Sequence, residues 1–175
     1  MTTRDALPAT IHTARLTLRA PVPADLADIV AMADNPKMLL TTATLPHPFT
    51  EADGRAVIAE AGDSDGISAY AITGADDRFM GTVHLKYVAG KPPEIGYWLG
   101  EPHWGQGYGG EVVAGLVKSI QHLPGFDIID ARVLESNPAS VRVLEKAGFA
   151  IIEHTQSVVE RHRGKPLVVL RRVAT

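Results

Sequence analysis

The sequence predicts a single mixed α/β domain built on a mostly antiparallel sheet. Its 175 residues and 45% hydrophobic content suffice for one substantial core and are too few for two ordinary ones. Stretches with the periodicity of strands alternate with stretches of helical periodicity, in the order β-α-α-β-β-β-α-β-α-β-β. Several predicted strands follow each other through short turns, which favours antiparallel pairing. We therefore expect about four helices that flank a sheet of six to seven strands.

The first part of the chain predicts a tail, a strand and a helix. We expect residues 1–10 to form a flexible tail of the single domain 1–175. Leucines alternate with polar residues over 15–19, which is typical of a half-buried strand. Apolar residues at helical spacing predict a helix over 26–33. This helix ends before Pro36, because the residue that precedes a proline avoids the helical region.

An irregular loop and a second helix come next. The stretch 39–49 is mostly apolar and contains two prolines that interrupt regular structure. Thr50 and Asp53 match a capping box, in which each residue satisfies a backbone amide of the other. We expect the second helix to begin there and to end near residue 61.

Three strands then form a predicted antiparallel meander over 67–73, 79–88 and 94–99. A short turn rich in glycine and aspartate, residues 74–77, separates the first two strands, which is a hairpin signature. Strict alternation along the second strand assigns Phe79 to the same face as Val83.

The remaining elements alternate between helix and strand. An apolar stripe after a glycine-rich turn predicts a helix, and a buried strand follows over 128–134. Because a helix connects this strand to 94–99, we expect the two strands to run parallel. Asn137 and Pro138 suit the N-cap and first position of a fourth helix. Two further strands, 150–160 and 167–173, close the chain.

Composition limits the classes of function. The net charge is −3, from 17 Lys and Arg against 20 Asp and Glu, so nucleic acid is not an expected partner. The absence of cysteine excludes disulfides and thiolate zinc sites and favours a cytoplasmic protein. No apolar run is long enough to span a membrane. The histidines show no metal-ligand spacing, and we expect no metal.

The glycine-rich turn, residues 105–110, is the strongest functional signal. Four of its six residues are glycines, so its backbone can expose amides, and the helix after it adds free N–H groups and a positive dipole end. This pattern indicates an anion site, with a purely structural turn as the alternative. The spelling G-x-G-x-x-G suggests a dinucleotide fold, but too few residues follow it for a doubly wound sheet. A nucleotide P-loop is excluded because Glu111 stands where that motif needs lysine.

Four stretches of the chain, one of which contains the glycine turn, form a distinctive set. They are Thr-Ala-Arg-Leu-Thr-Leu-Arg (13–19), Glu-Ile-Gly-Tyr-Trp-Leu (94–99), Trp-Gly-Gln-Gly-Tyr-Gly-Gly-Glu (104–111) and Glu-Ser-Asn-Pro-Ala-Ser-Val-Arg-Val-Leu-Glu-Lys-Ala-Gly-Phe (135–149). Together they resemble the GNAT N-acetyltransferase superfamily, and within it the RimJ/RimL branch. The resemblance covers nearly the whole chain and implies an acyl-CoA N-acyltransferase fold, with a V-shaped splay between the strands 94–99 and 128–134. One departure from the superfamily pattern is Trp104, which stands where arginine or glutamine is usual.

The resemblance implies acetyl-CoA as co-substrate. Its pyrophosphate would lie on the backbone amides of the glycine turn, and its pantetheine arm would pair with the end of strand 94–99. Asn137 would contact the arm, although a plain helix cap explains it equally well. The implied cofactor-binding residues are Tyr97, Trp98, Leu99, Gln106, Gly107, Tyr108, Gly109, Gly110, Asn137 and Ser140.

The expected reaction moves acetyl from acetyl-CoA to a primary amine by direct attack in a ternary complex. The family motif makes Ser140 the candidate that protonates the departing thiolate, and Glu94 the candidate base; His84, His103 or water are alternatives. The acceptor is a protein N-terminus or a small-molecule amine, and the protein is a monomer or homodimer. The alternative function is a non-catalytic acyl-CoA-binding or regulatory module. The basic run 161–165 is expected to be a solvated turn.

Overall fold

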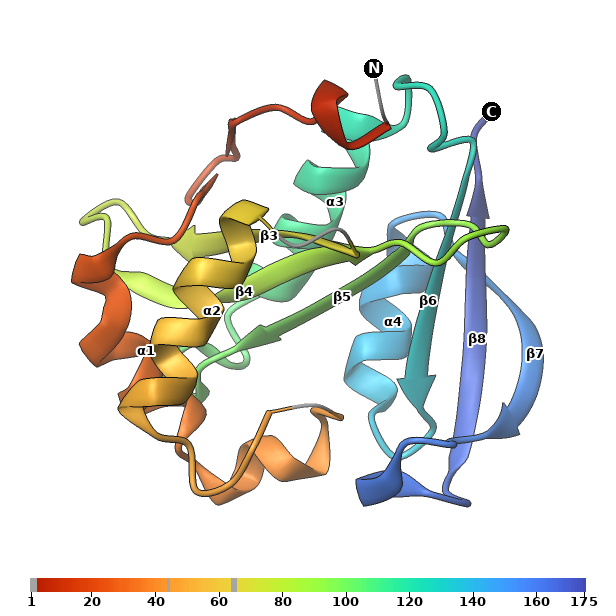
Figure 1. Ribbon diagram of the computed structural model, residues 1–175. Helices are drawn as coiled ribbons and strands as arrows, with labels where there is room; N and C mark the ends of the chain where they lie inside the picture. The colour runs from red at the N-terminus through yellow and green to blue at the C-terminus, as the bar shows by residue number, and fades with distance from the viewer. Residues whose placement is uncertain (1–2, 44, 64–65) are drawn as a thin grey trace.

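The computed structural model describes residues 3–43, 45–63 and 66–175 (Figure 1). One sheet holds eight strands in the order β1-β2-β3-β4-β5-β6-β8-β7. All neighbouring strands are antiparallel except β5 and β6, which are parallel. The helices are α1 (Leu26–Ala33), α2 (Glu51–Asp63), α3 (Tyr108–Ile120) and α4 (Pro138–Lys146). The strands are β1 (Thr10–His12), β2 (Thr17–Arg19), β3 (Ile67–Thr73), β4 (Phe79–Lys86), β5 (Glu94–Leu99), β6 (Ile128–Leu134), β7 (Ala150–Gln156) and β8 (Pro166–Val173).

The predicted fold class is confirmed, and the sheet gains one strand beyond the expected six or seven. The added strand is β1, which has three residues and pairs with β2 through Ile11 and Leu18. Such a short strand has too few residues to show a periodicity. It lies next to the expected tail, where the carbonyl of Pro8 accepts a hydrogen bond from the Tyr70 hydroxyl at 2.7 Å.

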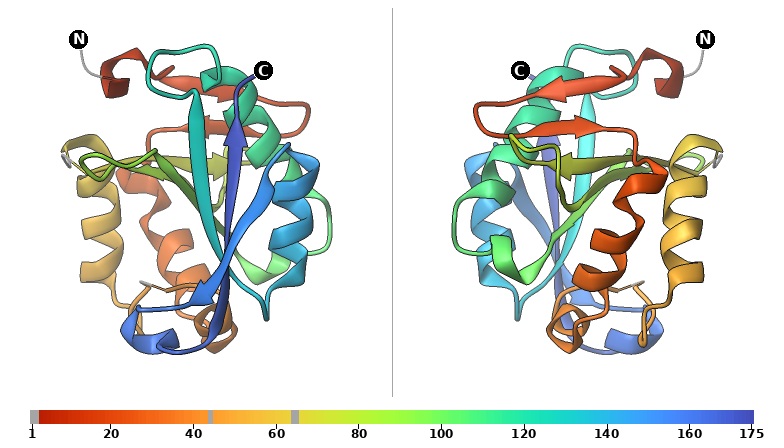
Figure 2. Two further views of the ribbon diagram at one scale, coloured as in Figure 1. Left: turned by 90° about the vertical axis from the view of Figure 1, so that its right-hand side faces the viewer. Right: turned by 90° about the vertical axis from the view of Figure 1, so that its left-hand side faces the viewer.

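The helices form two layers, with α1 and α2 on one face of the sheet and α3 and α4 on the other (Figure 2). The larger core cluster lies on the α3 and α4 side, and a smaller one lies beneath α1 and α2. The inner face of α3 is fully apolar, which explains the stripe that predicts this helix. Its buried residues are Val112, Val113, Leu116, Val117 and Ile120.

The predicted faces of β4 are wrong at the start of the strand. Ile72 is paired with Gly81 but Thr73 with Phe79, so Met80 is an extra residue in a β-bulge. The bulge reverses the alternation, and Phe79 packs beneath α1 and α2 whereas Met80 joins Val83 in the larger core. Strict alternation cannot reveal a bulge from the sequence.

The predicted splay between β5 and β6 is confirmed. Only the first two residues of β5, Glu94 and Ile95, are paired with β6, at Asp130 and Ala131. Figure 1 shows the two strands separating from that end. The rest of β5 therefore keeps one edge of its backbone unpaired by the sheet.

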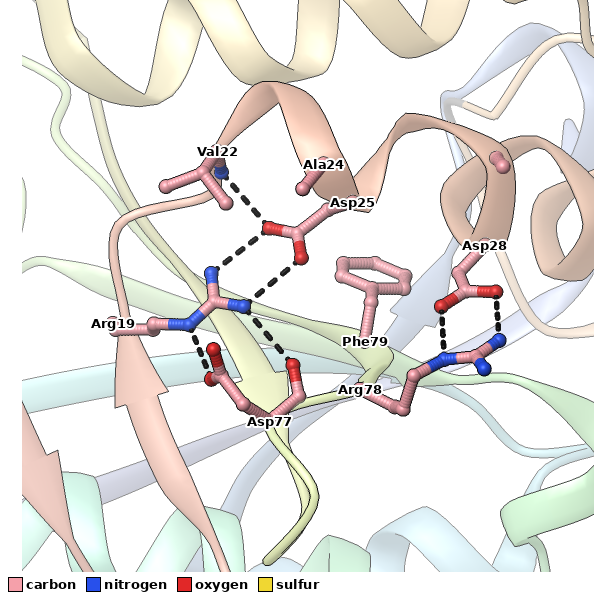
Figure 3. A pocket seen from close by; sticks show the side chains of 9 residues that line it. Arg19, Val22, Ala24, Asp25, Asp28, Asp77, Arg78 and Phe79 are labelled. Carbon is pink, nitrogen blue, oxygen red and sulfur yellow. Dashed lines mark hydrogen bonds and ion pairs between the residues drawn. The ribbon is translucent and has the colours of Figure 1, made fainter.

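A buried ion pair anchors the start of α1 to the sheet. Arg19 on β2 donates from both terminal nitrogens to the Asp25 carboxylate at 2.9 Å, and its Nε donates to Asp77 at 2.8 Å (Figure 3). Burial alone would raise the pKa of Asp25, but the hydrogen bonds from Arg19 and from the Val22 amide outweigh burial and lower this pKa. Nearby, Arg78 pairs with Asp28 across a shallow hollow of about 280 Å³. The hollow is lined by charges that already have partners.

We predict that Asp25→Asn lowers the free energy of unfolding by about 3 kcal/mol at pH 7, because it leaves the Arg19 charge without its buried partner. The lowered pKa of Asp25 contributes stability that is present above the unfolded-state pKa of about 3.9 and is lost as pH falls through the folded-state value. The difference from wild type should therefore shrink below about pH 4 in urea unfolding. Asp28→Asn is the control, and its cost should stay within about 1 kcal/mol because Arg78 is 68% exposed. Equal costs for both variants would contradict the prediction.

Candidate active site

The glycine turn leads directly into α3 and forms an open cradle. Gly105 and Gly107 have φ of 73° and 80°, in the left-handed region that favours glycine, and Gly107 is the N-cap of α3. A Cβ placed on Gly105 or Gly110 would meet no atom within 4 Å, so the surface of the turn is open. The first amides of α3 lack helical partners and carry the positive end of its dipole. This geometry suits an anionic group.

Tyr97 and Ser140 meet where β5 leaves β6. The Tyr97 hydroxyl lies 3.0 Å from Ser140 Oγ on α4, and a Cβ placed on Gly109 would lie 3.3 Å from the Tyr97 ring. Tyr97 therefore stands between the first turns of α3 and α4. Burial raises the pKa of Tyr97, against a smaller lowering by the hydrogen bond with Ser140, so the phenol is protonated at neutral pH. The sequence predicts a backbone contact for Tyr97 and does not predict this side-chain pair, which depends on tertiary packing.

Asn137 caps α4. Its side-chain oxygen accepts a hydrogen bond from the Ser140 amide at 3.3 Å, as the cap alternative predicts. The cap fixes the first turn of the helix and with it the position of the Ser140 hydroxyl. A contact between Asn137 and a cofactor stays a prediction.

The end of β5 is tied to the glycine turn by Trp104. The Trp104 indole donates from Nε1 to the carbonyl of Leu99 at 2.6 Å, and the Gln106 side chain donates to the carbonyl of Pro102 at 2.9 Å. Trp98 points to the face of the sheet opposite to that of Tyr97, and its ring centroid lies 5.7 Å from that of Phe79. The residue that departs from the superfamily pattern thus joins the predicted pantetheine strand to the predicted phosphate turn.

Glu94 lies on the other face of the sheet from Ser140. Side chains alternate along β5, so Glu94 shares the face of Trp98, which packs beneath α1 and α2, whereas Tyr97 joins the core under α3. The carboxylate of Glu94 is 35% exposed and accepts a hydrogen bond from Arg132 Nε at 3.2 Å. The candidate acid and the candidate base therefore approach the splay from opposite sides.

The two candidate histidines lie in different places. His84 is paired with Gly96 on the face of Glu94, and a Cβ on Gly96 would lie 2.6 Å from its Nε2, so the ring covers that glycine. Burial, with a smaller contribution from Lys86, lowers the pKa of His84, and the imidazole is neutral at pH 7. His103 lies instead against Tyr108 at the start of α3, with ring centroids 6.3 Å apart.

The expectation that the basic run 161–165 is a solvated turn holds for residues 163–165, which are exposed, and is wrong for Arg161 and His162. Arg161 donates to the carbonyls of Thr42 and Leu45, and the His162 ring, in a side chain 2% exposed, lies 3.0 Å from the Thr42 carbonyl. These contacts tie the β7–β8 connection to the loop before α2, at the same end of the molecule (Figure 1). Residue 44 of that loop lies outside the described residues.

A protein-family model matches most of this sequence, including the residues of the site. The acetyltransferase (GNAT) domain family matches residues 15–150, which include the glycine turn, Glu94 and Ser140. The chain belongs to the GNAT acetyltransferase family. The resemblance in the sequence is thereby confirmed at the level of the family, and the protein carries an acetyltransferase domain.

Individual relatives of this GNAT domain agree with the family match. A probable N-acetyltransferase of Bacillus subtilis, YjcK, is 41% identical over 80 residues, and this match covers 44% of each chain. The fold is similar to an acetyltransferase of the GNAT family from Bacillus anthracis, with a TM-score of 0.81, 17% identity and coverage of 94% of this chain and 98% of the other. No helix among the described residues is long and apolar enough to cross a membrane.

Two further solved structures were determined with ligands. Spermidine N-acetyltransferase from Vibrio cholerae, in complex with CoA and spermine, gives a TM-score of 0.76 at 17% identity. The match covers 91% of this chain and 95% of the other. RimL, a ribosomal L7/L12 alpha-N-protein acetyltransferase in complex with CoA, gives a TM-score of 0.80 at 15% identity. That match covers 94% of this chain and 97% of the RimL chain. At such identities the likeness establishes the shared fold.

We predict that Asn137→Ala lowers the free energy of unfolding by about 1 kcal/mol, because the Ser140 amide loses its cap. Asn137→Asp keeps an acceptor oxygen at the same position and should cost less than half as much. Urea unfolding of the three proteins measures both values. If the alanine and aspartate variants are equally stable, the cap contributes nothing and this explanation of Asn137 is wrong.

Proposed function

We propose that this GNAT domain transfers the acetyl group of acetyl-CoA to a primary amine by direct attack in a ternary complex. The observation that carries the proposal is that two features adjoin each other. The unpaired edge of β5 begins where β5 leaves β6 and runs to Leu99, whose carbonyl Trp104 ties to the glycine turn, and Gly109 of that turn lies against the Tyr97 ring. A ligand with an anionic end and an extended amide-bearing arm matches both features.

The residues present fit acetyl-CoA. The amides of residues 106–110 would hold the pyrophosphate, since the two positive-φ glycines turn the backbone there without a side chain in the way. The unpaired edge of β5, from residue 97 to 99, would pair with the amides of the pantetheine arm in the manner of an added strand. Two of the solved structures similar to this fold contain CoA, which supports this choice of ligand.

Acetyl-CoA supplies the reaction with an acetyl thioester, and Ser140 acts on its leaving group. As the amine nitrogen bonds to the carbonyl carbon and the carbon–sulfur bond breaks, the sulfur takes the proton of the Ser140 hydroxyl. The Tyr97 hydroxyl, 3.0 Å from Ser140 Oγ, donates a proton to the serine oxygen in turn. Burial raises the pKa of Tyr97, so the phenol holds its proton until negative charge develops on the sulfur, and water returns a proton to the phenolate after the products leave.

The base acts from the other face of the sheet. Glu94 takes the proton of the attacking amine through water, which reaches this partly exposed carboxylate. Arg132 orients the carboxylate through its Nε. His84 is the alternative base, because its neutral ring lies over Gly96, where β5 has already left β6.

The acceptor amine binds beside α1 and α2, on the side of the sheet that carries Glu94. Thr42 and Leu45, in the loop before α2, border this side, and Arg161 holds their carbonyls to the β7–β8 connection. RimL acts on a protein N-terminus and the Vibrio cholerae enzyme on spermidine, so primary amines of both kinds are acceptors to test.

Thiol release from acetyl-CoA tests the function with a panel of polyamines, amino acids and N-terminal peptides. We expect turnover with at least one amine and acetylation of its nitrogen by mass spectrometry. Tight CoA binding without turnover on any acceptor would instead favour the non-catalytic acyl-CoA-binding module.

We predict that Ser140→Ala lowers kcat by about 100-fold while the Kd for CoA changes less than about twofold, because proton donation acts on the transition state. Tyr97→Phe keeps the ring and removes the hydroxyl, and it should lower kcat by a smaller factor. Steady-state kinetics and calorimetric CoA titration measure these effects. Unchanged turnover in Ser140→Ala would show that another group protonates the sulfur.

We predict that Glu94→Gln lowers kcat/KM by about 100-fold and that His84→Gln has a smaller effect, if Glu94 is the base. The dependence of kcat/KM on pH is measured for both variants and for wild type. The loss of kcat/KM should be larger in Glu94→Gln than in His84→Gln at every pH measured. The reverse pattern would assign the base to His84.

A further inference from the structure

Arg15 lies beside the glycine turn and contacts it with its side chain. It lies in the connection between β1 and β2, and its guanidinium stacks on the Tyr108 ring at 4.3 Å. Its Nη1 donates to the carbonyl of Gln106 at 3.0 Å, and its Nε donates to the Glu111 carboxylate at 2.7 Å. A residue 91 positions earlier in the chain thus contacts the predicted phosphate cradle.

One end of the guanidinium remains available. Nη2 has no hydrogen-bond partner among the residues that the structure describes, and a Cβ placed on Gly107 would lie 3.5 Å from it. The side chain is 47% exposed, so solvent or a ligand reaches this nitrogen. The hydrogen bonds of Nε and Nη1 fix the plane of the guanidinium, and Nη2 then lies next to Gly107.

We propose that Arg15 is a phosphate-binding residue of this site and that its Nη2 donates to the pyrophosphate of acetyl-CoA, an inference that rests on the proposed function. The superfamily pattern has arginine or glutamine at the position of Trp104, where the indole instead binds the carbonyl of Leu99. Arg15 brings a cation to the turn from another part of the chain. An arginine suits this role because its planar fork binds phosphate oxygens directionally.

Arg15 also neutralises a charge that would oppose binding. Glu111 lies in the first turn of α3, and its carboxylate accepts hydrogen bonds from Thr13 Oγ1 at 2.6 Å and from the Arg15 amide at 2.7 Å. Burial favours the neutral acid, but these bonds and that from Arg15 Nε lower the pKa of Glu111, which stays ionised. Without the arginine, this negative charge would face a phosphate at the same helix end.

Isothermal titration of the full chain with CoA, dephospho-CoA and pantetheine tests the proposal. Arg15→Gln should weaken the binding of CoA and of dephospho-CoA by about tenfold and leave the affinity for pantetheine unchanged, because only the first two ligands carry a pyrophosphate. Arg15→Lys should recover only part of the loss, since it keeps the charge without the fork. Adding Glu111→Gln to Arg15→Gln should also restore part of the affinity, because it removes the uncompensated carboxylate.

Arg55→Gln is the matched control, because it removes the same charge from an exposed pair on α2. It should leave all three affinities unchanged. CoA affinity within twofold of wild type in Arg15→Gln overturns the proposal, as does an equal loss for pantetheine, which would indicate a collapsed site. If Arg15→Gln weakened the binding of CoA but not that of dephospho-CoA, the assignment of Arg15 to the pyrophosphate would be overturned. Failure of the wild-type protein to bind CoA would instead count against the proposed function.

Discussion

The separation of β5 from β6 is the constraint on which the site depends. A strand inside a sheet normally has both backbone edges paired, and an unpaired edge in the interior costs free energy unless something binds it. Here the pairing stops after two residues, at Ile95 and Ala131. The glycine turn and α4 converge on the resulting gap from one face, and Glu94 and His84 approach it from the other. In the proposed reaction, this gap lets groups from both faces of the sheet reach one ligand.

In the proposed function the glycine turn acts through its backbone, and so other parts of the chain must hold that backbone in place. Trp104 ties its beginning to the end of β5, and Arg15 ties its middle and its helix to the connection between β1 and β2. Both residues use side chains to fix carbonyl oxygens. With the Gln106 carbonyl engaged by Arg15, the amide of the same peptide unit is left to face an anion in the proposed complex.

The charges on the acceptor side are arranged in pairs. Glu94 is paired with Arg132, and its neighbour in register, Asp130, accepts two hydrogen bonds from Arg171 at 2.7 and 2.8 Å. Such pairing keeps the side chains ordered without a large net charge on this face. It is consistent with an amine acceptor that must lose its proton before it attacks, because an uncompensated cluster of carboxylates would favour the ammonium form.

The sequence by itself determined the helices and seven of the eight strands, because these depend on local periodicity, caps and turn residues, and the likeness of its motifs to those of a known family determined the family. Asn137 as a cap and the parallel pairing of β5 with β6 follow from neighbouring residues in the same way. The tertiary structure alone decided the bulge at Met80, the hydroxyl pair of Tyr97 and Ser140, and the contacts of Arg161 and Arg15. Each of these joins segments far apart in the chain or shifts a register by one residue. Their geometry is set by how the elements pack, for which the sequence carries no local signal.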